Sequence, residues 1–130
     1  MEMGDHTDRK KVLVVDDEVD ALEIVRKRLE TSYNILAASS GSVGLKMAEA
    51  ERPDIIILDI MMRGVSGLEV LDVLKHSPHL SKIPIIMVTA LDDYNTQLEA
   101  NHLGARFYIT KPLNGPLLEN KVKQLLSLAA

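Results

Sequence analysis

The chain has 130 residues, close to the size of one domain, and its 46% hydrophobic content can supply one buried core. It has no cysteine, which excludes disulfides and thiolate metal sites, and its formal net charge of −4 argues against direct contact with nucleic acid. No apolar stretch approaches the roughly 20 residues of a membrane span, and residues 1–10 lack the apolar core of a signal peptide, so we expect a cytoplasmic protein with no membrane partner.

Short apolar runs alternate with amphipathic stretches after a lead-in, residues 1–10, that we expect to be disordered. The apolar runs predict five strands: Lys11–Val15, Tyr33–Ala38, Ile55–Leu58, Ile85–Val88 and Arg106–Thr110. The amphipathic stretches predict five helices: Val19–Thr31, Ser42–Glu51, Gly67–Lys75, Asp93–Leu103 and Pro116–Leu128. This alternation is typical of an α/β fold with a doubly wound parallel sheet. The central strands are continuous Val/Ile/Leu runs, which indicates burial on both faces. We expect residues 11–130 to form one domain.

The second predicted helix has few large apolar residues. Its spacing predicts that Val43 and Met47 face the core. Gly44 inside this helix costs roughly 1 kcal/mol relative to alanine unless a close contact between helix and sheet requires it. On the fourth predicted helix, Leu98 and Leu103 are the expected core residues.

Polar residues follow four of the five predicted strands. Asp16 and Asp17 follow the first strand, Asp59 the third, Thr89 the fourth and Lys111 the fifth. Asp and Thr after a strand are also common loop and helix-capping residues, so each one alone has a structural explanation. Because open α/β sheets bind ligands at the carboxyl ends of their strands, we expect the whole set to share one crevice.

The crowding of acids in that crevice predicts a metal ion. Two carboxylates about 4 Å apart repel by around 4 kcal/mol at an effective dielectric constant near 20. Lys111 can neutralise only one of Asp16, Asp17 and Asp59. A hard divalent cation with oxygen ligands resolves the imbalance, and Mg²⁺ typically combines one or two carboxylates with waters and phosphate oxygens. We therefore predict Mg²⁺, with Mn²⁺ as an alternative.

Short motifs in this order resemble the receiver domain of two-component response regulators, including the chemotaxis response regulator. The motifs are Val12–Glu18 (VLVVDDE), Asp59–Met62 (DIMM) with Gly67, Thr89-Ala90 and Tyr108–Pro112 (YITKP). The resemblance covers residues 11–126. It implies a flavodoxin-like three-layer sandwich with sheet order 2-1-3-4-5 and a cis Lys111-Pro112 bond.

The resemblance also implies roles at the metal and acceptor site. Asp59 matches the phosphoacceptor, which a sensor histidine kinase or a histidine phosphotransfer protein phosphorylates. Asp17 matches the direct Mg²⁺ ligand, and Asp16 matches the second acid, which usually acts through water. Met61 matches the position whose backbone carbonyl completes the protein ligands.

Three further residues match the part of a receiver that converts phosphorylation into a surface change. Lys111 matches the lysine that pairs with the phosphoryl oxygens. Thr89 matches the hydroxyl that shifts toward the phosphate, and Tyr108 matches the aromatic side chain that changes rotamer with it. The implied output surface consists of the fourth helix, the fifth strand and the fifth helix. An unknown downstream protein, an output domain or a second copy of the chain would contact it.

Two features depart from the common receiver pattern. Receivers commonly have proline four residues after the phosphoacceptor, whereas this chain has Arg63, which adds a cation near the site; we expect its side chain to point to solvent. Met61 and Leu91, two residues beyond Asp59 and Thr89, occupy positions that in receivers flank the path of the attacking water. Both are apolar, so we expect a long-lived acyl phosphate.

The sequence argues against two functions other than a working receiver. A receiver-like module that only binds proteins usually lacks one of the acids or the lysine, and this chain has them all. A phosphohydrolase of the haloacid dehalogenase type needs a second Asp two residues after the nucleophile, where this chain has Met61. We therefore expect no enzyme acting on an external metabolite. The sequence leaves open whether this is a single-domain protein or part of a larger regulator or hybrid kinase.

Overall fold

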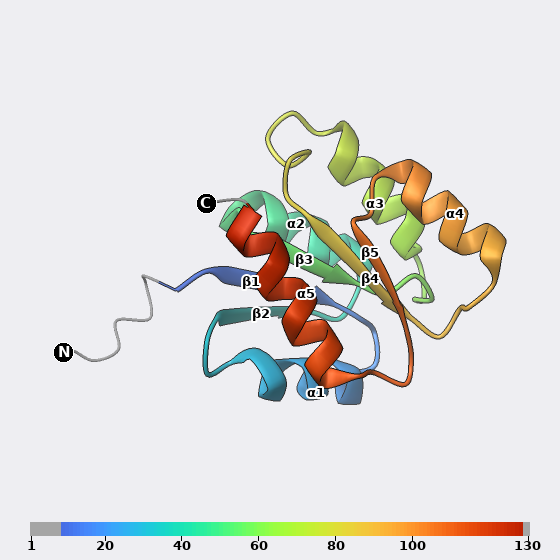
Figure 1. Cartoon of the computed structure of the whole chain (residues 1–130). Helices are drawn as coiled ribbons and strands as arrows, with labels where there is room; N and C mark the ends of the chain where they lie inside the picture. The colour runs from blue at the N-terminus through green and yellow to red at the C-terminus, as the bar shows by residue number, and fades with distance from the viewer. Residues whose placement is uncertain (1–8, 129–130) are drawn as a thin grey trace.

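A computed structural model describes residues 9–128, which form one parallel sheet flanked by helices (Figure 1). The strands are β1 (Lys11–Val15), β2 (Asn34–Ala38), β3 (Ile55–Leu58), β4 (Ile85–Thr89) and β5 (Phe107–Thr110). Their order in the sheet is β2-β1-β3-β4-β5, and every neighbouring pair is parallel. The predicted fold class and strand order are confirmed. The predicted disordered lead-in lies, apart from Arg9 and Lys10, outside the described residues.

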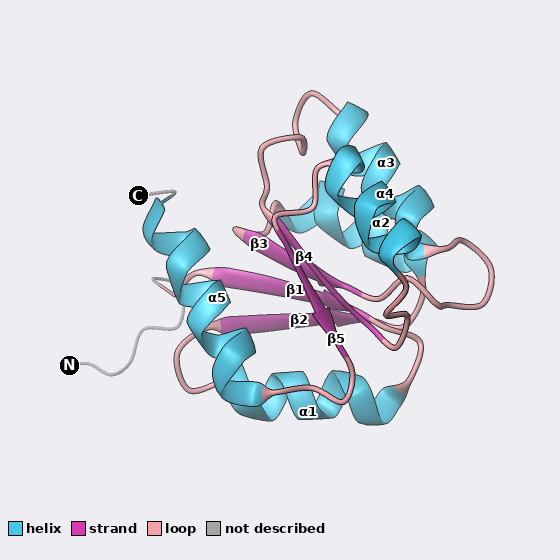
Figure 2. Cartoon of the chain, turned by 45° about the vertical axis from the view of Figure 1, so that its right-hand side comes forward, coloured by secondary structure: helices cyan, strands magenta, loops and turns pink. Residues whose placement is uncertain are grey.

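Five helices cover the two faces of the sheet. They are α1 (Val19–Leu29), α2 (Gly41–Glu51), α3 (Gly67–His76), α4 (Tyr94–Leu103) and α5 (Gly115–Leu128). Figure 2 shows α1 and α5 on one face and α2, α3 and α4 on the other, which is the expected three-layer sandwich. The predicted boundaries differ by two residues at most. The cis peptide bond between Lys111 and Pro112, implied by the receiver resemblance, is present.

The core is split by the sheet into two layers, because side chains alternate along each strand. On β1, Leu13 and Val15 belong to the layer beneath α2, α3 and α4, whereas Val12 and Val14 belong to the layer beneath α1 and α5. All four residues of β3 are buried, as their continuous apolar run predicted. The edge strands β2 and β5 are only partly buried.

Helix α2 packs on the sheet through small residues. Its buried positions are Gly41, Gly44 and Ala48, whereas the side chain of Val43 is 44% exposed. A Cβ at Gly44 would lie 2.9 Å from Cγ2 of Val15, so the close approach of helix and sheet requires glycine there. The prediction that Val43 faces the core was therefore wrong, because the helix presents its small residues to the sheet.

The fourth helix shows the same preference for a small contact residue. Ala100 is the buried residue of α4, and Leu98 is 39% exposed. The prediction that Leu98 lies in the core was therefore wrong. Leu103, the other predicted residue, packs against the core as a partly buried side chain.

The loop between β3 and α3 is held by an unusually close backbone contact. The N–H of Gly67 donates to the carbonyl of Ile60 (2.9 Å), and a Cβ at Gly67 would lie 2.0 Å from the carbonyl oxygen of Asp59. Ser66 and Glu69 form a capping box that fixes the first turn of α3 beside this contact. The start of α3 therefore constrains the backbone of Asp59 directly.

Replacing Gly67 with alanine is expected to lower the free energy of unfolding by about 3 kcal/mol, because the added methyl group meets backbone atoms that cannot rotate away. Gly64→Ala is the matched control: it lies in the same loop, has φ +81°, and its added Cβ meets open space. Its left-handed backbone predicts a loss of only about 1–2 kcal/mol. Urea unfolding of both variants tests this; an equal or smaller loss for Gly67→Ala would contradict it.

Candidate functional site

The carboxyl edge of the sheet gathers charged side chains from three strand ends. Asp16 follows β1, Asp59 follows β3 and Lys111 follows β5. The Nζ atom of Lys111 lies 2.9 Å from Oδ2 of Asp16, 3.1 Å from Oδ2 of Asp59 and 3.2 Å from Oε1 of Glu18. The single ammonium group of Lys111 therefore pairs with Asp16, which is 95 positions away in the sequence, and with Asp59, which is 52 positions away.

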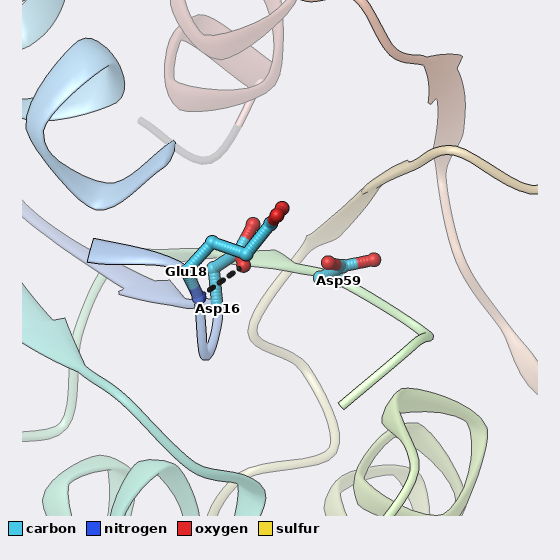
Figure 3. Close-up of side chains that lie close together, drawn as sticks. All are labelled: Asp16, Glu18 and Asp59. Atoms are coloured by element: carbon cyan, nitrogen blue, oxygen red, sulfur yellow. Dashed lines mark hydrogen bonds between the residues drawn. The ribbon is translucent and has the colours of Figure 1, made fainter. Parts of the chain in front are cut away.

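The acidic members of this group lie close to one another. One carboxylate oxygen from each of Asp16, Glu18 and Asp59 lies within 4.8 Å of the others. Figure 3 shows Asp16 and Glu18 projecting from the segment after β1, and Asp59 from the end of β3. The dashed line in that figure is the hydrogen bond from the Glu18 N–H to Oδ1 of Asp16 (3.0 Å). We name these three acids and Lys111 the acid cluster.

Glu18 was absent from the predicted site residues. It precedes the first residue of α1, where an acidic side chain has an ordinary helix-capping explanation, but it makes no side-chain cap and turns to Lys111 instead. The signal available in the sequence was its place directly after Asp16 and Asp17. Sequence alone did not show which of these consecutive acids face the lysine.

Asp17 lies outside the acid cluster and contacts the loop after β3. Its Oδ2 atom accepts a hydrogen bond from the backbone N–H of Arg63 (2.9 Å) and lies 3.5 Å from Nε of the same residue. The backbone hydrogen bond is the largest cause of a lowered pKa for the Asp17 carboxyl group. The Arg63 side chain is 91% exposed, in keeping with the expectation that it faces solvent, although its Nε remains near Asp17.

Burial shapes the electrostatics of the acid cluster. Asp16 and Asp59 are both buried, with about one-twentieth of each residue exposed. Burial raises the pKa of Asp16, and the hydrogen bond from Lys111 partly offsets this rise. Burial acts to lower the pKa of Lys111, but its contacts with Asp16 and Asp59 prevail and raise that pKa above its ordinary value. Lys111 therefore stays protonated at neutral pH.

The donor set fits a hard divalent cation. Three carboxylates share one ammonium, so the cluster has an excess of negative charge even though Lys111 contacts all three. All available ligands are oxygens, which suits Mg²⁺ or Mn²⁺. The backbone of Met61 borders the same site, because its N–H donates to Oδ1 of Asp59 (3.2 Å).

Thr89 and Tyr108 meet at the loop after β4. Thr89 is fully buried, and its Oγ1 accepts a hydrogen bond from the N–H of Leu91 (3.5 Å). The hydroxyl of Tyr108 donates to the carbonyl of the same Leu91 (2.7 Å). Burial, followed by the charges of nearby acids, raises the pKa of Tyr108. The carbonyl of Thr89 accepts a hydrogen bond from the backbone N–H of Lys111 (2.8 Å), which links the ends of β4 and β5 beside the acid cluster.

Comparison with known sequences identifies the class of protein. The family described as "Response regulator receiver domain" matches residues 12–123. This chain belongs to that family and is a receiver domain of the kind found in two-component response regulators.

Individual proteins of known sequence are similar to this chain over most of its length. It is 39% identical over 118 residues to the "Alkaline phosphatase synthesis transcriptional regulatory protein PhoP" of Bacillus subtilis, covering 90% of this chain and 48% of that protein. It is 34% identical over 116 residues to "Response regulator PleD" of Caulobacter vibrioides, covering 88% of this chain and 26% of that one. The chain thus spans half or less of the length of these relatives.

Solved structures agree with the sequence relatives. Chemotaxis protein CheY4 of Vibrio cholerae superposes with a TM-score of 0.85 at 27% identity, over 90% of this chain and 98% of that one. A putative response regulator from Chloroflexus aurantiacus gives a TM-score of 0.87 at 28% identity, over 92% and 98% of the two chains. Membership of the receiver family argues against the alternative function of a phosphohydrolase.

No helix among residues 9–128 combines the length and apolar character needed to span a bilayer.

Proposed function

We propose that Asp59 is the phosphoacceptor of this receiver domain, which we take to extend over residues 11–130, and that Lys111 pairs with the incoming phosphoryl group. The observation that carries the proposal is the 3.1 Å contact between Lys111 Nζ and a buried Asp59 carboxylate at the carboxyl edge of the sheet. In the transfer, an Asp59 carboxylate oxygen forms a bond to phosphorus. The bond from phosphorus to the donor histidine nitrogen breaks, and the imidazole keeps the electron pair and takes a proton from solvent.

The acids around Asp59 are proposed to hold a divalent metal. Asp16, Asp17 and Asp59, with the backbone carbonyl of Met61, are the proposed ligands. Glu18, which has a carboxylate oxygen within 4.8 Å of oxygens of Asp16 and Asp59, is a further oxygen donor. When bound, Mg²⁺ would offset negative charge on the acids and the phosphoryl oxygens. Lys111 supplies a second positive charge on the opposite side of the Asp59 carboxylate from Met61, since the two contact different oxygens of Asp59.

We propose that phosphorylation is relayed through Leu91. A phosphoryl group adds negative charge and acceptor oxygens beside Thr89, whose hydroxyl then gains a stronger partner than the 3.5 Å contact with Leu91. Because Tyr108 is bound to the carbonyl of Leu91, a shift of this loop changes the position of the tyrosine as well. Thr89 and Tyr108 are thus the proposed switch residues.

The output surface is proposed to comprise α4, β5 and α5. Helix α4 follows the Leu91 loop directly and exposes two large apolar side chains, Tyr94 (73%) and Leu98 (39%). On the α5 part of this surface, the ammonium of Lys121 lies 4.5 Å from the centre of the Phe107 ring of β5. An unidentified downstream protein or output domain, or a second copy of the chain, is the proposed partner. The receiver itself is proposed to be cytoplasmic and to turn over no external metabolite.

The phosphodonor is proposed to dock beside α1. A groove of about 250 Å³ runs between α1 and the segment after β5, and it reaches Asp59 and Lys111 at one end. Its apolar lining includes Ile24, which is 56% exposed, and Leu113. A helix of a sensor histidine kinase or a phosphotransfer protein could cover this lining while presenting its phosphohistidine to Asp59.

Incubation with acetyl phosphate and Mg²⁺ is expected to add one phosphoryl group to the chain, seen by intact-protein mass spectrometry. The mass increase is expected to disappear in Asp59→Ala and in the presence of a chelator, because the nucleophile or the metal is then missing. Glu49→Gln, which removes an exposed charge on α2, serves as the control and should be phosphorylated like the wild type. Equal labelling of Asp59→Ala would refute Asp59 as the acceptor.

An acidic residue in the groove is expected to block the protein donor selectively. Ile24→Asp should slow phosphotransfer from a histidine kinase that phosphorylates the wild type by about tenfold or more, as loss of a central apolar contact does in protein interfaces. Its labelling by acetyl phosphate should be unchanged. Val73→Asp on α3 is the matched control, because Val73 is equally an exposed helix residue (50%) but lies on the other face of the sheet. If both variants accept phosphoryl groups from the kinase at the wild-type rate, the donor docks elsewhere.

The acyl phosphate is expected to be long-lived because no polar side chain flanks it at Met61 or Leu91. Met61, which is 57% exposed, and Leu91, which packs against the core, both have apolar side chains that cannot orient an attacking water. Met61→Asn should therefore lose its phosphoryl group several-fold faster than the wild type, whereas Val43→Asn, an exposed apolar residue on α2, should not. Loss is followed by mass spectrometry after donor removal, and an unchanged rate in Met61→Asn would count against this explanation.

A further inference from the structure

Asp17 contacts Arg63 and not the acid cluster. The backbone N–H of Arg63 donates to Oδ2 of Asp17 at 2.9 Å, and the Nε atom of Arg63 lies 3.5 Å from the same oxygen. The three acids whose oxygens lie within 4.8 Å of one another are Asp16, Glu18 and Asp59. The acid that is our proposed direct metal ligand is therefore engaged by the β3–α3 loop.

Both contacts depend on the residue type at position 63. Proline, which receivers commonly have there, has no N–H to donate and no charge. Arginine supplies both the backbone donor and a guanidinium group. The side chain of Asp17 is only 16% exposed, whereas that of Arg63 is 91% exposed, so the guanidinium can move into solvent without disturbing the core.

We propose that Arg63 competes with the divalent cation for the Asp17 carboxylate and so lowers the metal affinity of this receiver. The proposal rests on the proposed function of the acid cluster. The guanidinium beside Oδ2 offsets the negative charge of the Asp17 carboxylate, so a cation that binds this carboxylate either displaces the guanidinium or meets a second positive charge beside it. An exposed ion pair is weak and screened by salt, which makes the competition modest and dependent on ionic strength.

The test compares Mg²⁺ affinities of the wild type and Arg63→Gln by isothermal titration calorimetry at low ionic strength. Arg63→Gln keeps the backbone N–H and removes only the charged group. Its affinity for Mg²⁺ is expected to be about two- to fivefold higher than that of the wild type, as expected for loss of one exposed ion pair. The difference is expected to shrink at high salt, where the pair is screened.

Two further variants separate the ion pair from general charge effects. Lys82→Gln removes an exposed positive charge from the loop before β4, at the opposite end of the sheet, and should bind Mg²⁺ like the wild type. Arg63→Lys retains the charge and should stay close to the wild type. An equal gain in Lys82→Gln or Arg63→Lys would overturn the competition.

The result also distinguishes failure of the Arg63 competition from failure of the proposed metal site. If the wild type binds Mg²⁺ and Arg63→Gln binds it equally or more weakly, Arg63 does not compete, and the proposed function is untouched. If neither protein binds Mg²⁺, both proposals fail together.

Discussion

The constraint on which this molecule depends is the sharing of one ammonium group by three carboxylates at the edge of the sheet. Lys111 contacts Asp16, Glu18 and Asp59, and two of these acids are buried. A buried charge is tolerated only where it is paired, so the strand ends must stay in register for the cluster to exist. The remaining negative charge suits the site to a divalent metal, and such a metal together with Lys111 would offset the negative charge of a phosphoryl group.

The sheet fixes this geometry because its central strands are buried on both faces. The register of β1 with β3 pairs Val15 with Leu58, so Asp16 and Asp59 leave the sheet as neighbours. Gly67 allows the start of α3 to lie directly against the carbonyl of Asp59, which limits movement of the backbone at that residue. The positions of Asp16 and Asp59 are therefore set by the packing of residues that lie outside the acid cluster.

Much of this arrangement could be predicted from the sequence. Strands and helices followed from alternating patterns, and the strand ends indicated where Asp16, Asp59 and Lys111 would lie, because parallel strands share one carboxyl edge. The strand order and the individual roles came from the resemblance to receivers, since periodicity alone does not determine them. These roles remain proposals.

Other features depended on side-chain directions and close packing that spacing does not encode. Val43 lies at a helical position compatible with the core, yet α2 turns Gly44 and Ala48 to the sheet. Asp17 and Glu18 are adjacent in the sequence, but one turns to Arg63 and the other to Lys111. Which acid joins the cluster is decided by these local hydrogen-bond partners.

The loop at Leu91 and the groove beside α1 both lie next to the candidate site. Leu91 is hydrogen-bonded to both Thr89 and Tyr108 and precedes α4, and this loop is the path by which we propose that phosphorylation reaches the output surface. On the face that carries α1 and α5, the groove beside α1 reaches Asp59 and Lys111. The proposed donor surface therefore borders the same pair of residues from which we propose that the signal starts.

The most direct test of the charge imbalance is urea unfolding of the wild type and Asp59→Asn in chelator and in millimolar Mg²⁺. Removal of one carboxylate relieves repulsion, so Asp59→Asn should be at least as stable as the wild type in chelator. Mg²⁺ should stabilise the wild type by mass action and stabilise Asp59→Asn less. The account would be contradicted if Mg²⁺ left the urea midpoint of the wild type unchanged and if Asp59→Asn were less stable than the wild type in chelator.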